Sequence, residues 1–471
     1  MAKGTFLRGW FRKKSEVEEE TYDDEYASSE EASVPSPALN LAPERPADGL
    51  PSFLASAIDR PTTRTARNKL LNARLILRDL FTPAQPVTQR NRFAGRLELF
   101  SKLIEVLEEQ RSHVVLYGER GIGKTSTLHI LSHVARESQY IVAYVSCGGD
   151  SRFDEIFRSV LREIPLLYLS GVSPLSDEAE GGLTFADKLP ASFNARELSD
   201  LLSRVIGTRV IIILDEYDRI EDPQFRRSVA ELIKNLSDRA ARVQLVLAGV
   251  SSNLQELIGY IPSIRRNIVG LPMPRMTGTE VRSLINLGEK GAGIRFEEPV
   301  TEMISLLSNG SPYLVRLLSH HACMKALDAG RMLVQVEDIR MALEKAVQEA
   351  RTRVTPSGIK QVNALLDGSG NGLLAAIAKS ASTPDGWFTP ALVAENLPTS
   401  VSPDSVERDL QRLSSSHNLL ERDDEGSQSR FRFRDEALPT YLWLRVASDQ
   451  FQRGPEARIV PEMARGVENL G

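Results

Sequence analysis

Cysteine is scarce in this sequence, and so are long apolar runs and any excess of positive charge. The 471 residues include two cysteines, Cys147 and Cys323, which lie too far apart to form a metal-binding or redox motif. No apolar run approaches the roughly 18 residues needed to cross a bilayer, and the basic first residues lack the apolar core of a signal peptide. The net charge of −5 gives no general basic field for nucleic acid or membrane. We therefore expect a cytoplasmic protein with reduced thiols.

What the chain does have is enough apolar sequence, 41% of its residues, for the cores of about three domains. Alternating strand and helix patterns predict an α/β domain with a parallel sheet. Helical periods alone then predict a helical lid, and three helices followed by two short strands predict a winged helix. The expected divisions are a disordered tail over 1–65, the α/β domain over 66–276, the lid over 277–352, the winged helix over 356–450 and a polar tail over 451–471.

The expected N-terminal tail begins with a basic and aromatic segment, residues 1–14. Phe6, Trp10 and Phe11 are interleaved there with arginines and lysines. As a helix, this segment would dock on a membrane surface or a partner, although we favour a solvated terminus. The acidic and Pro-rich residues that follow cannot bury enough apolar surface to offset their ordering entropy.

A glycine-rich stretch between a strand pattern and a helical pattern is the strongest motif. It matches G-x-x-x-x-G-K-[ST], in which backbone N–H groups and a helix N-terminus bind phosphates. Lys124 would reach the β- and γ-phosphates, and the Thr125 hydroxyl would ligate Mg²⁺. The predicted nucleotide-binding residues are Gly118, Glu119, Arg120, Gly121, Ile122, Gly123, Lys124, Thr125 and Ser126.

Two carboxylates end the most continuous β-branched run of the chain, residues 210–214. A run of this kind predicts a central parallel strand, and ligands bind at the carboxyl ends of such strands. Asp215 is suited to hold Mg²⁺ beside Thr125. Glu216 is suited to activate the attacking water as a general base. We assign no role to Asp218.

Serines and arginines elsewhere are candidates for sensing the γ-phosphate. Ser251 or Ser252 follows the next predicted strand, although either residue would equally serve as a helix cap. Arg265 or Arg266 would be a catalytic arginine supplied to a neighbouring subunit, or the two form a solvated surface pair. Arg316, on a predicted lid helix, would contact a phosphate or lie on the surface.

The predicted winged helix does not have the basic face expected of a DNA-binding domain. Arg430, Arg432 and Arg434 alternate with phenylalanines and share one strand face, which would track phosphates or be the exposed side of a hairpin. The loop between the strands begins with Asp423 and Asp424. A protein-interaction role is therefore at least as well supported as DNA binding.

Taken together, these motifs resemble the P-loop ATPases of the AAA+ and STAND types, including origin-recognition-like ATPases with a winged-helix tail. The resemblance is based on Phe93-Ala94-Gly95-Arg96, the P-loop, Leu214-Asp215-Glu216, Arg266 and Gly310-Ser311-Pro312. It implies ATP and Mg²⁺ as ligands, Gly95 and Arg96 beside the adenine, and Arg266 as a finger arginine in an ATP-dependent homo-oligomer. It also implies that Arg316 is a second sensor. The Gly-Ser-Pro turn replaces an arginine-led sensor sequence, which favours a STAND-like switch.

Three hypotheses follow. The first is an ATP-hydrolysing regulatory switch that acts on an unknown protein partner. The second is a DNA-bound ATPase of the origin-recognition or transposition type, and the third is a nucleotide-gated scaffold that does not hydrolyse ATP.

Overall fold

The computed structural model describes residues 66–173, 181–251, 254–258, 264–366, 371–397, 401–424 and 429–453. All of these lie within one compact unit of the chain, Thr63–Gly471. The predicted N-terminal tail, with its basic and aromatic segment at residues 1–14, and residues 454–471 of the predicted C-terminal tail lie outside the described residues. The predicted start of the C-terminal tail is wrong, because residues 451–453 are helical.

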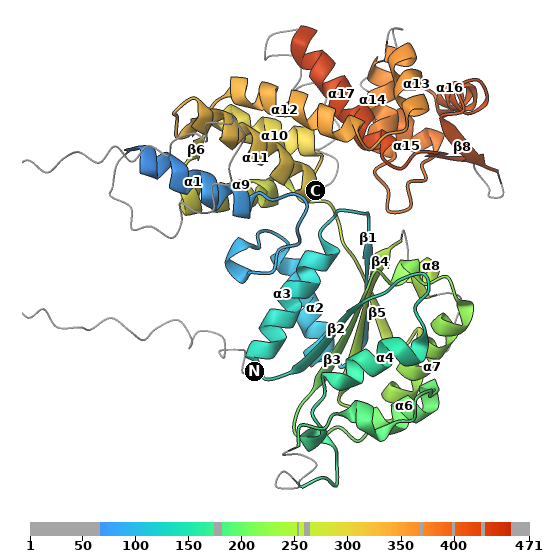
Figure 1. Cartoon of the computed structure of the whole chain (residues 1–471). Helices are drawn as coiled ribbons and strands as arrows, with labels where there is room; N and C mark the ends of the chain where they lie inside the picture. Colours follow the sequence, from blue (N-terminus) through green and yellow to red (C-terminus); the bar gives the residue numbers. More distant parts are fainter. Residues whose placement is uncertain are drawn as a thin grey trace, which may run out of the picture. The chain divides into compact units, whose positions relative to one another are not determined.

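A five-stranded parallel sheet organises the first half of this unit (Figure 1). Its strands are β1 (His113–Gly118), β2 (Ile141–Ser146), β3 (Val210–Asp215), β4 (Val243–Val250) and β5 (Ile268–Pro272). They lie in the order β2-β3-β4-β1-β5, and every neighbouring pair is parallel. The predicted α/β fold with a parallel sheet is confirmed, and the predicted strand over 210–214 is β3, which lies inside the sheet.

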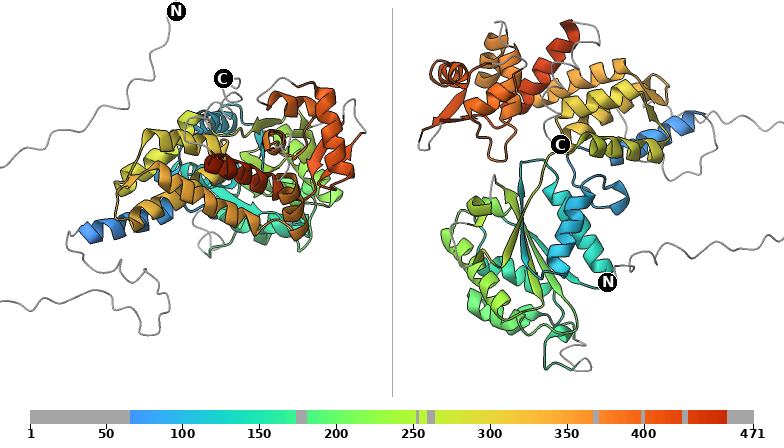
Figure 2. Two further views of the ribbon diagram at one scale, coloured as in Figure 1. Left: turned by 90° about the horizontal axis from the view of Figure 1, so that it is seen from above. Right: turned by 180° about the vertical axis from the view of Figure 1, so that it is seen from behind.

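Helices cover both faces of the sheet because successive side chains of a strand point to opposite sides. Ile211 and Ile213 of β3 belong to one core, whereas Ile212 and Leu214 belong to the other. Figures 1 and 2 show the two helical layers. The first layer contains α2 (Leu97–Glu108) and α3 (Lys124–Glu137), and the second contains α4 (Phe153–Arg162), α6 (Ala195–Leu202) and α7 (Pro223–Asp238). The sheet is therefore buried on both faces, and the carboxyl ends of its strands remain available for a ligand-binding site.

A helical region follows the sheet, as predicted. Its helices are α9 (Gly278–Ala292), α10 (Glu298–Ser308), α11 (Pro312–Asp328) and α12 (Val336–Arg351). The expectation that the lid over 277–352 is purely helical is wrong, because β6 (Arg295–Phe296) and β7 (Leu333–Val334) form a short parallel pair. Two-residue strands are too short to produce an alternating sequence pattern.

Helix α1 (Ala66–Leu80) packs against this helical region. Its Ala73 and Leu77, with Phe81 just after it, lie in the same core as α9 and α11. The predicted α/β domain begins at residue 66, so the sequence predicts that α1 packs against the sheet instead. The apolar period of α1 predicts a buried face but does not identify the partner.

Three helices and a β-hairpin occur in the predicted order in the C-terminal region, with one unpredicted helix before them and another after them. The elements of this region are α13 (Pro356–Leu366), α14 (Asn371–Ser380), α15 (Pro390–Glu395), α16 (Pro403–Ser415), β8 (Leu420–Asp423), β9 (Arg430–Phe433) and α17 (Leu438–Arg453). Strands β8 and β9 pair antiparallel, and Phe388 adds a bridge to Phe431. Helix α17, which was not predicted, joins this region to α10 because the Trp443 indole donates to Leu307 O over 2.8 Å.

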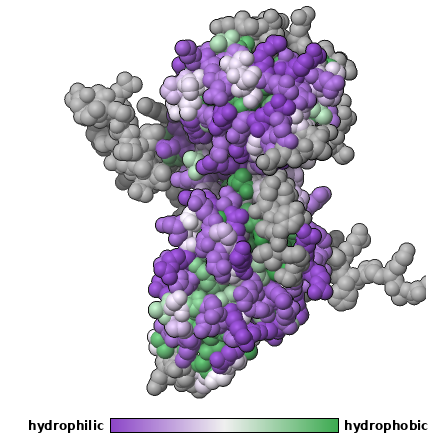
Figure 3. All heavy atoms as spheres, turned by 90° about the vertical axis from the view of Figure 1, so that its right-hand side faces the viewer, coloured by the Kyte–Doolittle hydropathy of each residue, from purple (hydrophilic) through white to green (hydrophobic). Residues whose placement is uncertain are grey.

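The face of the molecule in Figure 3 is mainly hydrophilic, with smaller apolar patches between the polar residues. Among the described residues, large apolar side chains are exposed at Leu97, Leu167, Leu183, Ile206 and Leu333. No helix in the described part of the chain is long and apolar enough to span a bilayer.

A buried histidine at the start of β1 makes the stability of the sheet dependent on pH. The backbone N–H of Leu245 donates to His113 Nδ1 over 2.9 Å, and burial lowers the pKa of His113 to about 4. Because the unfolded imidazole titrates near 6.5, the unfolded state binds more protons between these values, and stability is lost as the pH falls from 6.5 to 4. We expect His113 to account for roughly 3 kcal/mol of this loss at pH 4. Denaturation of wild type and His113→Asn at pH 7 and pH 4 checks this, because the variant should lose less stability on acidification. An equal loss in both proteins would contradict the assignment.

Candidate nucleotide site

The loop between β1 and α3 has the backbone shape that its glycines permit. Gly123 immediately precedes α3 with φ 101°, a conformation that L side chains rarely adopt. Gly118 ends β1, and a Cβ there would lie 2.9 Å from Met273 O. Strand, glycine-rich loop and helix follow one another as the motif requires, so the N-terminus of α3 is available to an anion.

Lys124 is folded back onto this loop. Its ammonium donates to Gly118 O over 2.8 Å and to Glu119 O over 2.7 Å. Burial lowers the pKa of Lys124 to about 8, against the opposing effect of nearby carboxylates, the largest being that of Asp218. Among the described residues, the Lys124 ammonium is bonded to backbone carbonyls and to no anion, so an anionic ligand would provide a charged partner.

Thr125 and Asp215 are joined directly, as the predicted metal site requires. The Thr125 hydroxyl donates to Asp215 Oδ2 over 2.8 Å, and the same oxygen accepts the Tyr144 hydroxyl over 2.6 Å. Asp215 is 3% exposed, and the Glu216 N–H donates to its second oxygen over 2.9 Å. Burial, followed by the bond to Asp215, raises the pKa of Tyr144. The carboxylate is thus fixed in orientation beside the start of α3.

Glu216 adopts a left-handed backbone with φ 54°, which is uncommon for a residue other than glycine and concentrates at functional sites. Its carboxylate accepts hydrogen bonds from Arg219 over 2.8 Å and from the Ser146 hydroxyl over 3.1 Å. The bond from Arg219 is the main reason why the pKa of Glu216 is lowered. The structure therefore presents Glu216 as an ionised, half-exposed carboxylate at the end of β3.

Asp218, for which the motifs predict no role, anchors the neighbouring strand. Its Oδ1 accepts the N–H of Val250 over 2.9 Å at the end of β4. A Cβ on Gly249 would lie 2.7 Å from that oxygen, so glycine allows the approach. Ser251, which comes next, is 4% exposed. The register of Gly118 with Val250 places Ser251 at the same sheet edge as the P-loop, whereas Ser252 lies outside the described residues.

Arg96 is a buried arginine whose charge has no bonded partner in the described part of the chain. Its two terminal nitrogens are buried without a hydrogen bond. Burial lowers its pKa to about 10, and the carboxylates of Glu280 and Glu119 oppose this effect. Gly95 and Arg96 both have positive φ, and the Arg96 N–H donates to Glu280 of α9. An unpaired buried guanidinium influenced by a P-loop carboxylate is a group for which an anionic ligand would provide a partner.

Arg275, which sequence reasoning missed, links the P-loop to the helical region. Its guanidinium donates to both carboxylate oxygens of Glu119, over 2.9 and 2.5 Å, and to Asn309 O over 2.6 Å. Next to Asn309, a Cβ on Gly310 would lie 2.5 Å from Met276 O, so the chain approaches itself too closely for a side chain. A signal for Arg275 did exist, because it is the only basic residue between β5 and α9.

We expect the Arg275–Glu119 pair to be energetically coupled. Its side chains are 27% and 17% exposed, so either truncation leaves a partly buried charge unpaired. Arg275→Ala and Glu119→Ala should each cost about 1–2 kcal/mol of unfolding free energy, and the double variant should cost about 1 kcal/mol less than their sum. Urea denaturation measures this cycle. The exposed Arg282–Glu298 pair is the matched control, with an expected coupling below about 0.5 kcal/mol. Additive costs at 119 and 275 would contradict the prediction.

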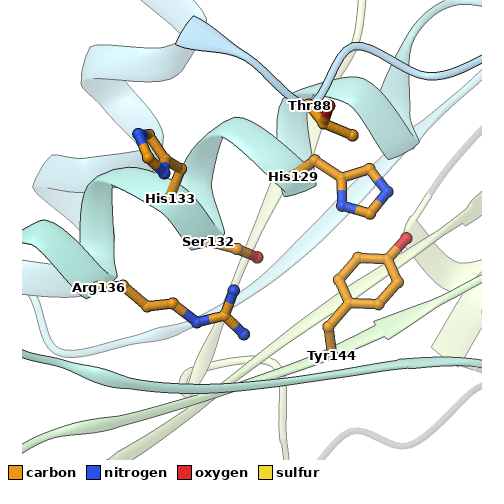
Figure 4. Close-up of a pocket in the computed structure, with 6 residues that line it drawn as sticks. All are labelled: Thr88, His129, Ser132, His133, Arg136 and Tyr144. Atoms are coloured by element: carbon orange, nitrogen blue, oxygen red, sulfur yellow. The ribbon is translucent and has the colours of Figure 1, made fainter.

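A cavity of about 290 Å³ lies along α3 on the side that faces β2 (Figure 4). It is lined by Thr88, His129, Ser132, His133, Arg136 and Tyr144. Most of these polar groups are already engaged within the fold: Arg136 donates to Val142 O, Ser132 to Leu128 O and Tyr144 to Asp215, and His133 lies 3.3 Å from Glu137. We assign no ligand to this cavity.

The sequence of this part of the chain agrees with the geometry, because residues 107–258 match a family model described as an AAA domain. The matched segment includes the P-loop, Asp215 and Glu216. Residues 107–258 thus form an AAA domain with a P-loop. No curated protein matches the chain.

Solved structures similar to this chain include the ORC2 protein of Aeropyrum pernix, with 18% identity over 79% of this chain and 97% of that one and a TM-score of 0.42. A Walker-type ATPase of Pyrococcus abyssi has 18% identity over 77% and 99% of the two chains and a TM-score of 0.45. Drosophila ORC bound to DNA has 15% identity over 84% and 97% and a TM-score of 0.41. At these values the likenesses carry no argument about substrate or partner.

The residues around the P-loop fit ATP and Mg²⁺, because they include buried cations for the phosphates and oxygen ligands for the metal. In the described part of the chain, Lys124 and Arg96 are buried cations without anionic hydrogen-bond partners. Lys124 begins α3, directly after the P-loop, and Arg96 directly precedes α2. Thr125 and Asp215 offer the oxygen ligands that Mg²⁺ prefers. Lys124 and Arg96 would hold phosphate or nucleotide, and Thr125 and Asp215 would hold the metal.

The remaining arginine candidates lie in two different places. Arg265 and Arg266 are exposed and precede β5, at the edge where the strands begin. They are thus about 16 Å of strand away from the P-loop of their own chain. Arg316 lies one turn beyond Tyr313, whose Cβ lies 3.9 Å from a Cβ built on Gly121. Burial lowers the pKa of Arg316 to about 10.

Proposed function

We propose that the AAA domain binds and hydrolyses ATP with Mg²⁺ and that this reaction switches the position of the helical region. The contact between Thr125 and Asp215 carries the proposal, because it unites the two predicted metal ligands at the end of the P-loop. Glu216, directly after Asp215, lies at the same strand end. A chance glycine-rich turn would not bring these residues together.

Each residue has a distinct part in this proposal. Lys124 would exchange the carbonyls of Gly118 and Glu119 for phosphate oxygens, keeping its charge paired. Thr125 and Asp215 would hold Mg²⁺, which neutralises charge on the phosphates when bound. Glu216 would orient a water molecule and accept its proton. Its hydrogen bonds from Ser146 and Arg219 define the direction of the carboxylate before the substrate arrives.

The switch would act through contacts between the P-loop and the helical region. Arg275 bridges Glu119 of the loop to Asn309, immediately before the turn into α11. Tyr313, in the first turn of α11, lies against Gly121. Phosphates bound at the P-loop would change the charges around Arg275 and Arg316, so the two arrangements of the helical region would differ in free energy.

The output of the switch is proposed to be a protein partner rather than DNA. Arg430 forms an ion pair with Asp423 and Arg432 with Glu421, both across the hairpin. The same arginines lie 5.5 and 4.8 Å from the ring of Trp387. Their charge is thus balanced within the hairpin, and the expected phosphate-tracking face is weakened. Salt-dependent binding of duplex DNA that is lost when both arginines become alanine would reverse this preference.

The direct test is the full-length chain with ATP, with and without Mg²⁺. We expect ATP binding and metal-dependent release of phosphate. Binding without any turnover would favour a nucleotide-gated scaffold, and no binding at all would end the proposal. Mass measurement with and without ATP tests whether the chain assembles, because a strict monomer excludes Arg265 and Arg266 from any site.

A further inference from the structure

Tyr144 is a residue to which neither the P-loop motif nor the strand pattern gives a role. It lies on β2, the edge strand, where it pairs with Ile213 two positions before Asp215 in the register. Its hydroxyl donates to Asp215 Oδ2 over 2.6 Å, one of the shortest side-chain hydrogen bonds at the site. The edge strand thereby contributes to the environment of the predicted metal ligand.

We propose that Tyr144 is a positioning residue for the metal, acting through the carboxylate of Asp215. This inference rests on the proposed function, because it concerns the Mg²⁺ that Thr125 and Asp215 would hold. Groups that hydrogen-bond to a metal-binding carboxylate fix its orientation, and their removal typically costs about 10- to 100-fold in metal affinity or activity.

The two hydroxyls that donate to Asp215 Oδ2, those of Thr125 and Tyr144, would play different parts when a metal is bound. The Thr125 hydroxyl, 2.8 Å away, is itself a predicted ligand, so its oxygen would turn toward the metal. Tyr144 would then be the side-chain donor that keeps this carboxylate oriented. The opposite oxygen, Oδ1, is held by the Glu216 N–H over 2.9 Å, which leaves a limited range of carboxylate rotation.

The ring of Tyr144 is itself held in place by α3. His129 stacks on it with ring centroids 4.8 Å apart and an interplanar angle of 16°. Figure 4 shows the two rings facing each other at one end of the cavity. His129 lies one turn after Thr125 on the same helix, so α3 positions both the predicted metal ligand and the ring that aims the hydroxyl at Asp215.

Tyr144→Phe removes the hydroxyl and keeps the stacked ring. Tyr140→Phe is the matched control, because Tyr140 flanks the same strand and its hydroxyl bonds an exposed carboxylate, Glu108, over 3.0 Å. The assay is a titration of Mn²⁺ into the full-length chain loaded with a non-hydrolysable ATP analogue, with bound metal read by electron paramagnetic resonance. A second measurement records binding of the analogue in EDTA.

We expect Tyr144→Phe to weaken Mn²⁺ binding about tenfold and to leave analogue binding in EDTA within about twofold of wild type. Tyr140→Phe should change neither value. If Tyr144→Phe lowers the melting temperature but binds Mn²⁺ as wild type does, the bond merely ties β2 to β3 and the inference is wrong. Failure of the proposed function is a separate outcome, in which the wild-type chain itself binds neither the analogue nor metal with it.

Discussion

Replacing Glu216 with Gln should reduce the rate of ATP hydrolysis by about 10²- to 10⁴-fold and leave ATP binding intact. The size of this effect is that of a lost general base. Glutamine has the shape of glutamate, and its amide oxygen still accepts hydrogen bonds, so Ser146 and Arg219 retain a partner. What disappears is the ability to take a proton from water. Single-turnover hydrolysis and equilibrium binding of ATP separate the two effects.

The control is Glu221→Gln, which removes an exposed carboxylate five residues further along the same loop. This variant should hydrolyse ATP at the wild-type rate. Equal turnover in wild type and Glu216→Gln would remove Glu216 from the reaction. If that shared rate is close to zero, the chain is a nucleotide-gated scaffold rather than an ATPase. A trapped ATP complex of Glu216→Gln would in turn be the form to use for capturing a protein partner.

The architecture of the AAA domain could be predicted because its sequence signals are local. The β-branched run ending at Leu214 is buried on both faces, and such a run has few alternatives to a central parallel strand. Glycines with positive φ and the Lys-Thr pair at the start of α3 likewise act within a few residues. The proximity of Thr125 and Asp215 could also be predicted, because the carboxyl ends of parallel strands lie at the same edge of a sheet.

Contacts made by residues far apart in sequence could not be predicted in this way. Arg275 and Glu119 are 156 positions apart, and no periodicity relates them. The sequence places Tyr144 in an apolar strand but does not show which strand lies beside it, so its contact with Asp215 could not be predicted. The packing of α1 on α9 and α11 could not be predicted either, because these helices are far from α1 in the sequence. The alternating arginines of the hairpin are evident in the sequence, but their pairing with Asp423 and Glu421 depends on the register of the hairpin.

Replacing Lys124 with Ala should weaken ATP binding by about 100-fold or more. In this structure the ammonium bonds two carbonyls of its own loop, and ATP would offer phosphate oxygens in their place. Hydrogen bonds to charged groups contribute about 1.5–3 kcal/mol each, and about 2.7 kcal/mol corresponds to the expected change in affinity. Because the side chain is buried, water cannot substitute fully for the missing cation.

Two controls separate this effect on binding from a loss of folding. Lys124→Ala also leaves Gly118 O and Glu119 O without their donor, so its unfolding midpoint must be measured beside the binding curve. Lys102→Ala removes an exposed lysine of α2 that forms an ion pair with Glu105, and this variant should bind ATP as wild type does. A folded Lys124→Ala variant with wild-type affinity would place the nucleotide away from the P-loop. That result would also remove the physical reason for linking Asp215, Glu216 and Arg275 to one reaction.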